Sequence, residues 1–247
     1  MCLRSKICSL LLLSVLLGGC VTVYNPATGK NEAMFIDTPL EVSFGENMDK
    51  QIKKEMKLSN NPLMVSRLEK IGNAVAGVSD RKDITYRFRV IDDKQLNAFT
   101  IPGGYIYVNS GLMDAANDDE LACVIAHELG HLAARHPAKK MQAALGYQVI
   151  VGIAAGFDAK DYMMQAMDAV FSISSLGYSR KDELAADKLS VKYSRRAGYS
   201  PYGMVTMFAK LEKEAKANGK NNYPEFLRSH PPTDARIKGI ENEIKEE

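Results

Sequence analysis

Apolar residues recur at helical spacing along most of this 247-residue chain. The pattern predicts helices over 40–58 and 62–78, and Asn61 followed by Pro62 is a typical start for the second. From Asn117 onward nearly every segment keeps this spacing, which predicts helices over 117–135, 138–155, 160–176, 180–197, 201–218 and 232–246. We therefore expect a predominantly helical protein.

Two short segments follow a strand pattern instead. Apolar and polar residues alternate over 84–90, as in a strand with one buried face. Residues 105–108 are a second predicted strand, because they follow the turn sequence Pro102-Gly103-Gly104. The strands predict a small antiparallel sheet, and the fold class is therefore α+β.

The first nineteen residues have the pattern of a secretory signal peptide. Arg4 and Lys6 precede an apolar stretch of about eleven residues, which is too short to span a bilayer. The following tetrapeptide, Leu17-Gly18-Gly19-Cys20, resembles a bacterial lipobox. We expect residues 1–19 to be removed and Cys20 to be acylated, with a chance cysteine after an ordinary signal peptide as the alternative.

Acyl chains on Cys20 would hold the protein on a membrane without a spanning helix. Val21 occupies the position directly after the cysteine, where an aspartate in such lipoproteins often signals retention in the inner membrane. Attachment to the outer membrane is therefore favoured. Residues 20–38 show no periodicity and are predicted to be a tether, and 39–247 a single domain. Residues 141–157 carry no charge but are shorter than a spanning helix, so a buried or groove-lining helix is favoured over one embedded in a bilayer.

Composition and charge exclude several classes of protein. With 46% hydrophobic and 25% charged residues, the chain is typical of a globular protein and not of a disordered one. Its 32 basic and 30 acidic side chains form no basic block, which argues against nucleic-acid binding. The sequence contains no glycine-rich phosphate loop, so we expect no nucleotide either. Without the signal peptide only Cys123 remains as a thiol, so no intrachain disulfide is expected.

The motif His127-Glu128-Leu129-Gly130-His131 carries the clearest chemistry. Residues four apart on a helix lie about 40° apart around its axis, so both imidazoles can bind one metal ion. Glu128 is turned by about 100° from His127 and can reach a water molecule on that metal. Imidazole and carboxylate ligands with one open position suit zinc, whereas two surface histidines are the alternative without function.

A third protein ligand is needed. His136 lies about 140° from His131 around the helix, beside Pro137, and is expected to point elsewhere. A metzincin would place its third histidine at position 137, so that class is excluded. Glu183 is the only glutamate between Glu128 and Glu212, and Asp187 lies one turn later on the same helical face. We expect Glu183 to bind the metal and Asp187 to hydrogen-bond a metal-binding imidazole, with a solvated acidic face as the alternative.

The chain resembles the M48 family of zinc metallopeptidases over about residues 40–245. Four motifs in the same order carry the resemblance: His127-Glu-x-x-His131, Tyr178-Ser-Arg-x-x-Glu183-x-x-Ala-Asp187, Asn97-Ala98-Phe99-x-x-Pro102-Gly103-Gly104-Tyr105-Ile106-x-Val108, and Ser229-His230-Pro231-Pro232-x-x-x-Arg236. It is similar to the small lipoprotein members related to the soluble peptidase domains of Oma1 and Ste24. The resemblance implies a zincin-like fold with the small sheet beside the His-Glu-x-x-His helix.

The resemblance also implies residue roles. His127, His131 and Glu183 would bind one zinc ion, Glu128 would act as general base, and Asp187 would orient a ligand. The segment Asn97, Ala98, Phe99 and Thr100 would form an edge strand that pairs with an extended substrate. The alternative for this segment is ordinary sheet structure that ends in a tight turn.

His230 is held before two prolines, where it could face the zinc. It could donate a hydrogen bond to the developing oxyanion, or occupy the open zinc position as a latch, and a plain helix-capping role is the alternative. Arg236 could anchor this loop or join the oxyanion contacts.

Four other features are weaker candidates. Cys123 lies among apolar residues, and we expect it in the core. Tyr178 or Tyr193 could stabilise an oxyanion, but the sequence offers no basis for choosing between them. Met163, Met164 and Met167 are expected to be core or groove lining.

The leading hypothesis is a zinc endopeptidase that cleaves unfolded or misassembled proteins on the periplasmic face of the bacterial cell envelope. Two other hypotheses remain open: a chaperone or assembly factor that uses the same groove with cleavage secondary, and a zinc-stabilised module without turnover. Glu128 argues against the last one, because a structural zinc site does not need a general base.

Overall fold

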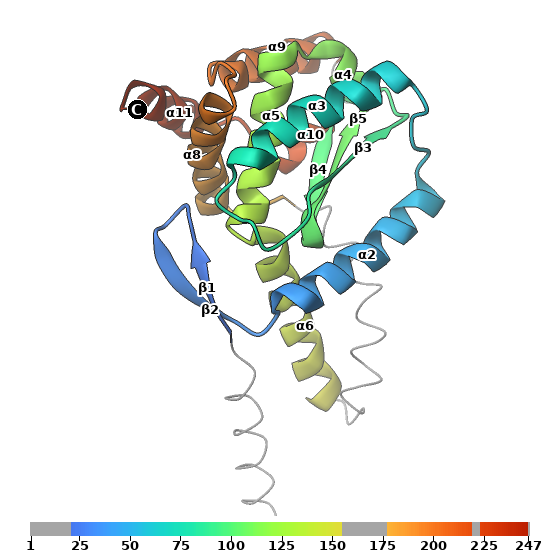
Figure 1. Cartoon of the computed structure of the whole chain (residues 1–247), viewed down its shortest axis with the longest axis vertical. Helices are drawn as coiled ribbons and strands as arrows, with labels where there is room; N and C mark the ends of the chain where they lie inside the picture. The colour runs from blue at the N-terminus through green and yellow to red at the C-terminus, as the bar shows by residue number, and fades with distance from the viewer. Residues whose placement is uncertain (1–20, 155–176, 219–222, 247) are drawn as a thin grey trace, which may run out of the picture.

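The computed structural model describes residues 21–154, 177–218 and 223–246. Most of the described residues lie in helices, and one helix, α5 (Asp118–Ala133), runs through the centre of the molecule (Figure 1). The fold is the predominantly helical α+β fold that the sequence predicted. The signal peptide, Cys20, the predicted helix 160–176 and its methionines lie outside the described residues.

The helices predicted within the described residues are all present, with boundaries shifted by a few residues. They are α2 (Thr38–Glu55), α3 (Pro62–Val78), α5, α6 (His136–Ala154), α8 (Arg180–Arg196), α9 (Gly203–Asn218) and α11 (Asp234–Glu246). Two short helices, α4 (Ser110–Ala115) and α10 (Glu225–Ser229), were not predicted, because each is too short to show helical periodicity.

The sheet next to α5 has three strands: β3 (Arg87–Ile91), β4 (Ala98–Ile101) and β5 (Tyr105–Asn109). Their order is β3-β5-β4, so that β4 pairs antiparallel with β5 while β3 pairs parallel with it. The prediction of a purely antiparallel sheet was therefore wrong. The reason is topological: β4 and β5 form a hairpin through the short η1 helix (Pro102–Gly104), and this hairpin inserts β5 between the other two strands. Gly103 has a φ of 78°, which favours glycine at this turn.

The segment after Cys20 is also more ordered than its composition predicted. Strands β1 (Val21–Asn25) and β2 (Lys30–Met34) form an antiparallel hairpin, with Gly29 in the turn at a φ of 66°. Gln142 of α6 accepts a hydrogen bond from the Phe35 backbone at 2.9 Å, so the residues after the hairpin are bound to the domain. This segment is short and uses long-range contacts that local sequence patterns do not show.

The main hydrophobic core surrounds α5. This helix packs against α8, α9, α3 and β4 (Figure 1). A Cβ atom on Gly130 would lie 2.9 Å from the Ala186 carbonyl oxygen, so the absence of a side chain allows α5 and α8 to approach closely. Cys123 is fully buried in this core, as predicted. The consequence is that residues on α5 and α8 face each other at short distance.

Helix α6 begins within the domain and extends away from it (Figure 1). Met141 and Leu145 are buried in a small cluster with Ile36, in agreement with a packed role for the start of the uncharged segment. Within the described residues, no helix is long and apolar enough to cross a membrane.

Candidate metal centre

The His-Glu-x-x-His motif lies in the middle of α5, as predicted. The helix starts with a reciprocal cap, in which Asn117 accepts from the Glu120 backbone and Glu120 accepts from the Asn117 backbone. His127, Glu128 and His131 are fully buried. The cap and the apolar faces of α5 fix the helix, so the two imidazoles project toward α8 with little freedom.

Four side chains converge on one point. His127, His131, Glu183 and His230 each offer a ligand atom, and these atoms all lie within 4.8 Å of one another. His127 Nε2 lies 3.1 Å from His131 Nε2, 3.4 Å from Glu183 Oε2 and 3.3 Å from His230 Nδ1. The ligand atoms of a tetrahedral zinc site with bonds of about 2.0–2.1 Å are separated by about 3.3 Å.

The donor set fits a metal ion better than it fits hydrogen bonding alone. An N–H···N contact needs one donor and one acceptor, so three buried imidazole nitrogens around one point cannot all be satisfied by one another. A cation at their centre would attract all three lone pairs and the carboxylate together. The chemistry of the set, imidazole nitrogen and carboxylate oxygen, is that of zinc sites in proteins.

Glu183 comes from the first turn of α8. That turn is capped reciprocally by Ser179 and Asp182, and the close approach of α8 to α5 brings the carboxylate to the histidines. Burial acts to raise the pKa of the Glu183 carboxyl, but the His230 charge and the hydrogen bonds from His127 and His230 hold this pKa well below its usual range. Glu183 is therefore negatively charged, as a ligand must be.

Asp187 lies one turn further along α8 and faces His127, as predicted. Its Oδ1 lies 3.0 Å from His127 Nδ1, the ring nitrogen that points away from the other histidines. Arg236 donates to both Asp187 oxygens at 2.7 Å and lies 2.8 Å from Glu183 Oε2. Arg236 thus belongs to the buried centre and also anchors its own loop, since it donates to the Pro231 carbonyl at 3.2 Å.

Glu128 does not join the four converging side chains. Its carboxylate is fully buried, and neither oxygen has a hydrogen-bond partner among the described residues. Burial raises the pKa of the Glu128 carboxyl, against the opposing charges of His230 and His127. A buried carboxyl that accepts no hydrogen bond is costly, and such groups mark functional sites.

His230 caps the C-terminal end of α10 and lies in the buried centre. Its Nδ1 lies 3.0 Å from Glu183 Oε1, and its Nε2 lies 3.4 Å from Glu128 Oε1. Only 1% of the residue is exposed. Both roles considered for His230 need it to face the metal site, and it offers one of the converging ligand atoms. Its position among the converging atoms is that of a fourth ligand.

His136 was expected not to be a metal ligand, and it is not among the converging side chains, but the helical angle behind this prediction does not describe where it lies. Its Nδ1 lies 2.9 Å from His131 Nδ1, although it is not one of the converging ligand atoms. The helix does not continue from His131 to His136: Arg135 has a φ of 57°, which turns the chain between α5 and α6. Helical angles therefore do not apply across this junction.

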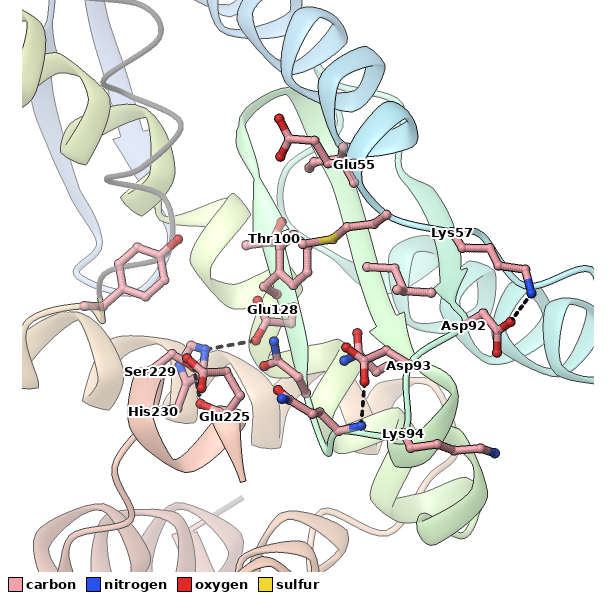
Figure 2. Close-up of a pocket in the computed structure, with 18 residues that line it drawn as sticks. Glu55, Lys57, Asp92, Asp93, Lys94, Thr100, Glu128, Glu225, Ser229 and His230 are labelled. Atoms are coloured by element: carbon pink, nitrogen blue, oxygen red, sulfur yellow. Dashed lines mark hydrogen bonds and ion pairs between the residues drawn. The ribbon is translucent and has the colours of Figure 1, made fainter. Parts of the chain in front are cut away.

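A groove of about 850 Å³ opens beside Glu128 and His230. Figure 2 shows these two residues near Thr100 at one end, with the Lys57–Asp92 ion pair toward the other. Of the four predicted substrate-binding residues, Asn97, Phe99 and Thr100 line the groove, whereas Ala98 is fully buried. Side chains alternate along a strand, which places Asn97 and Phe99 on one side and Ala98 on the other, whereas Thr100 lines the groove from the end of the strand that lies nearer Glu128 in Figure 2.

Several residues of the site were not chosen from the sequence. Tyr178 lines the groove and its ring stacks on His131 at 4.0 Å, whereas Tyr193 donates to Asp80 outside the site. Apolar groove residues come from the end of α2 and from β3, and no sequence motif marks them: Ile52, Met56 and Ile91.

Comparison with known proteins agrees with this geometry. A model described as peptidase family M48 matches residues 62–244. The beta-barrel assembly-enhancing protease of Escherichia coli (strain K12) is 25% identical over 88% of this chain and 46% of its own length. Metalloprotease LoiP of the same strain is 32% identical over 74% of this chain and 72% of its own length. The mitochondrial metalloendopeptidase OMA1 of Schizosaccharomyces pombe is 30% identical over 90% of this chain and 66% of its own length. The chain spans less than half the length of the beta-barrel assembly-enhancing proteases.

Proposed function

The chain belongs to peptidase family M48, and on this premise we propose that it is a zinc-dependent endopeptidase for unfolded or misassembled proteins of the bacterial cell envelope. The observation that carries the proposal is the convergence of His127, His131 and Glu183 on one point, with the Glu128 carboxylate, which accepts no hydrogen bond from the described residues, beside it at the groove.

In this proposal His127, His131 and Glu183 hold one zinc ion per chain. Bound zinc supplies two effects, polarisation of a peptide carbonyl and a lowered pKa of a water molecule. Glu128 would accept a proton from the attacking water and donate it to the leaving amine nitrogen. Its oxygens are available for this transfer because neither accepts a hydrogen bond from the described protein.

An extended substrate would lie along β4. Among the described strands, β4 pairs only with β5. It is therefore an edge strand, and its other side could pair with a substrate. The buried Oδ1 of Asn97 has no hydrogen-bond partner among the described residues and can accept a hydrogen bond from a substrate backbone N–H group. Pairing through the backbone requires an unfolded segment, which favours unfolded clients over compact ones.

The groove also suits the side chains that unfolded proteins expose. The groove lining includes apolar side chains: Ile52, Met56, Ile91 and Phe99. Apolar side chains are buried in folded proteins and become accessible when folding or assembly fails.

The decisive test is digestion of casein by the purified protein. We expect cleavage that stops when a chelator removes the metal and returns when zinc is added. Cleavage that persists without metal would contradict the mechanism, and a zinc-loaded protein that never cleaves unfolded polypeptide would exclude the endopeptidase.

One observation favours a second candidate, an assembly factor or chaperone that binds the same clients with cleavage secondary. His230 offers a fourth converging ligand atom, and a zinc ion with four protein ligands would have no open position for substrate. The name of the E. coli relative refers to assembly as well as to proteolysis. Prevention of client aggregation by the metal-free protein, without cleavage, would support this candidate.

We further propose that Cys20 is acylated after removal of residues 1–19 and holds the protein on the periplasmic face of the outer membrane. The support is the lipobox-like sequence that ends at Cys20. Strand β1 begins at Val21, and residues just after the hairpin bind α6. A lipid on Cys20 would therefore keep the domain close to the membrane surface rather than at the end of a long tether.

A further inference from the structure

His136 is a buried histidine that the proposed mechanism does not use. It begins α6 and is 3% exposed. Its two ring nitrogens contact different groups: Nδ1 lies 2.9 Å from His131 Nδ1, and Nε2 lies 3.3 Å from Asp182 Oδ1. His131, His136 and Asp182 thus form a chain of contacts, here called the His136 relay, that runs from the metal centre to the start of α8.

The relay has one consistent arrangement of protons. The Nε2 of His131 faces the other ligand atoms, 3.1 Å from His127 Nε2 and 3.5 Å from Glu183 Oε1, so its lone pair is the one directed at the metal. The His131 proton then lies on Nδ1 and is donated to His136 Nδ1. His136 in turn carries its proton on Nε2 and donates it toward the Asp182 carboxylate.

The other histidine of the motif has a shorter version of this arrangement. His127 Nδ1 lies 3.0 Å from Asp187, whose carboxylate is held by Arg236. A carboxylate behind a metal-binding imidazole fixes the orientation of the ring and raises its basicity. His131 has no carboxylate in that position. Instead, the His136 imidazole lies between His131 and the nearest carboxylate on that side, which belongs to Asp182.

The backbone around His136 is held in place from the opposite side. Arg135, whose φ of 57° directs the chain into α6, donates to Glu41 at 2.9 Å and to Asp83 at 2.7 Å. Glu41 is fully buried and also accepts from Arg81 at 2.7 Å. This network fixes the turn, and with it the position of the His136 ring relative to His131.

We propose that His136 is a positioning residue that accepts the Nδ1 proton of His131 and thereby orients His131 for metal binding, with Asp182 fixing the His136 ring. The inference rests on the proposed metal site at His127, His131 and Glu183. It concerns metal affinity first, and turnover only as a consequence.

The test compares zinc dissociation constants, measured by competition of the metal-free protein with a chromophoric chelator. His136→Phe keeps a ring of similar size but has no acceptor, and we expect zinc binding about 10- to 100-fold weaker. His136→Asn places an oxygen where Nδ1 was, and should return the dissociation constant to near the wild-type value. Gln142→Ala, also on α6 but outside the relay, should leave it unchanged.

A second pair of variants tests the far end of the relay without changing the core. Asp182→Ala removes both the contact to His136 and the reciprocal cap of α8, whereas Ser179→Ala weakens the cap and leaves Asp182 facing His136. We expect weaker zinc binding for Asp182→Ala, by about tenfold, and little change for Ser179→Ala. If circular dichroism shows that His136→Phe does not fold, the comparison of Asp182→Ala with Ser179→Ala still tests whether the relay supports zinc binding.

Three results would overturn the inference. The first is a wild-type dissociation constant for His136→Phe, and the second is equal weakening by His136→Phe and His136→Asn, which would indicate packing alone. The third is equal zinc binding by Asp182→Ala and Ser179→Ala. A wild-type protein that binds no zinc would instead refute the proposed function, and this inference with it, so the two failures are distinguishable.

Discussion

Replacing Glu128 by Gln separates proton transfer from metal binding and from folding. The two side chains have nearly the same shape, but the amide cannot take a proton from water. Glu128 is outside the group of converging ligand atoms, and neither of its oxygens has a hydrogen-bond partner in the described protein. The substitution therefore removes no metal ligand and breaks no hydrogen bond.

The expected magnitudes differ among the three properties. A general base contributes about 10²- to 10⁴-fold to turnover, which is roughly 3–5 kcal/mol of transition-state stabilisation. Zinc content should stay at one ion per chain. The midpoint of thermal unfolding should change by no more than about 2–4 °C, which corresponds to about 1 kcal/mol for a protein of this length.

The assay is casein cleavage by the zinc-loaded Glu128→Gln protein, with metal analysis and thermal unfolding on the same sample. Asp118→Asn is a matched control, because it makes the same acid-to-amide change on the exposed first turn of α5. It should cleave at the wild-type rate. If Glu128→Gln retains more than a few per cent of turnover at full zinc occupancy, Glu128 is not the general base.

Four further variants test other parts of the structure. Glu183→Ala should weaken zinc binding by removing one of the converging ligand atoms, and full occupancy at ordinary dilution by metal analysis would place the third ligand elsewhere. His230→Ala should raise cleavage of casein if the histidine acts as a latch, and should lower it about 100-fold, with zinc retained, if the histidine stabilises the transition state; unchanged turnover would leave only a capping role. Glu41→Gln should lower the free energy of unfolding, measured in urea, by about 3–5 kcal/mol, because Arg81 and Arg135 are buried and would lose the carboxylate that they share. Glu46 is exposed on the same helix, so Glu46→Gln should have little effect. Cys20→Ser should abolish partitioning into the detergent phase once removal of the signal peptide is verified, and continued partitioning would contradict the lipoprotein proposal.

Contacts within one element could be predicted from the sequence. His127, Glu128 and His131 belong to a single helix, and the geometry of that helix determines their relative directions whatever surrounds it. The facing pair Glu183 and Asp187 follows the same rule on α8. The assignment of Glu183 to the metal rested on the scarcity of other glutamates and on the resemblance to the family.

Contacts across a chain reversal could not be predicted. Arg135 in a left-handed conformation directs His136 back to His131, and no residue pattern marks an arginine for that conformation. The parallel pairing of β3 with β5 depends on the insertion of a hairpin between two strands, which alternation of side chains does not reveal. The hairpin formed by β1 and β2 lies in a segment without periodicity, because each of its strands is five residues long.

The sequence by itself determined which residues of α5 can act together at one metal ion, because the spacing of His127, Glu128 and His131 becomes a fixed geometry as soon as a helix forms. The tertiary structure alone decided how the rest is assembled around them. It brings α8 against α5 at Gly130, places His230 among the ligand atoms, sets His136 behind His131, and forms the groove from the end of α2 together with β4. These contacts join residues far apart in the chain or across a turn, and their geometry depends on the packing of whole elements rather than on any local pattern.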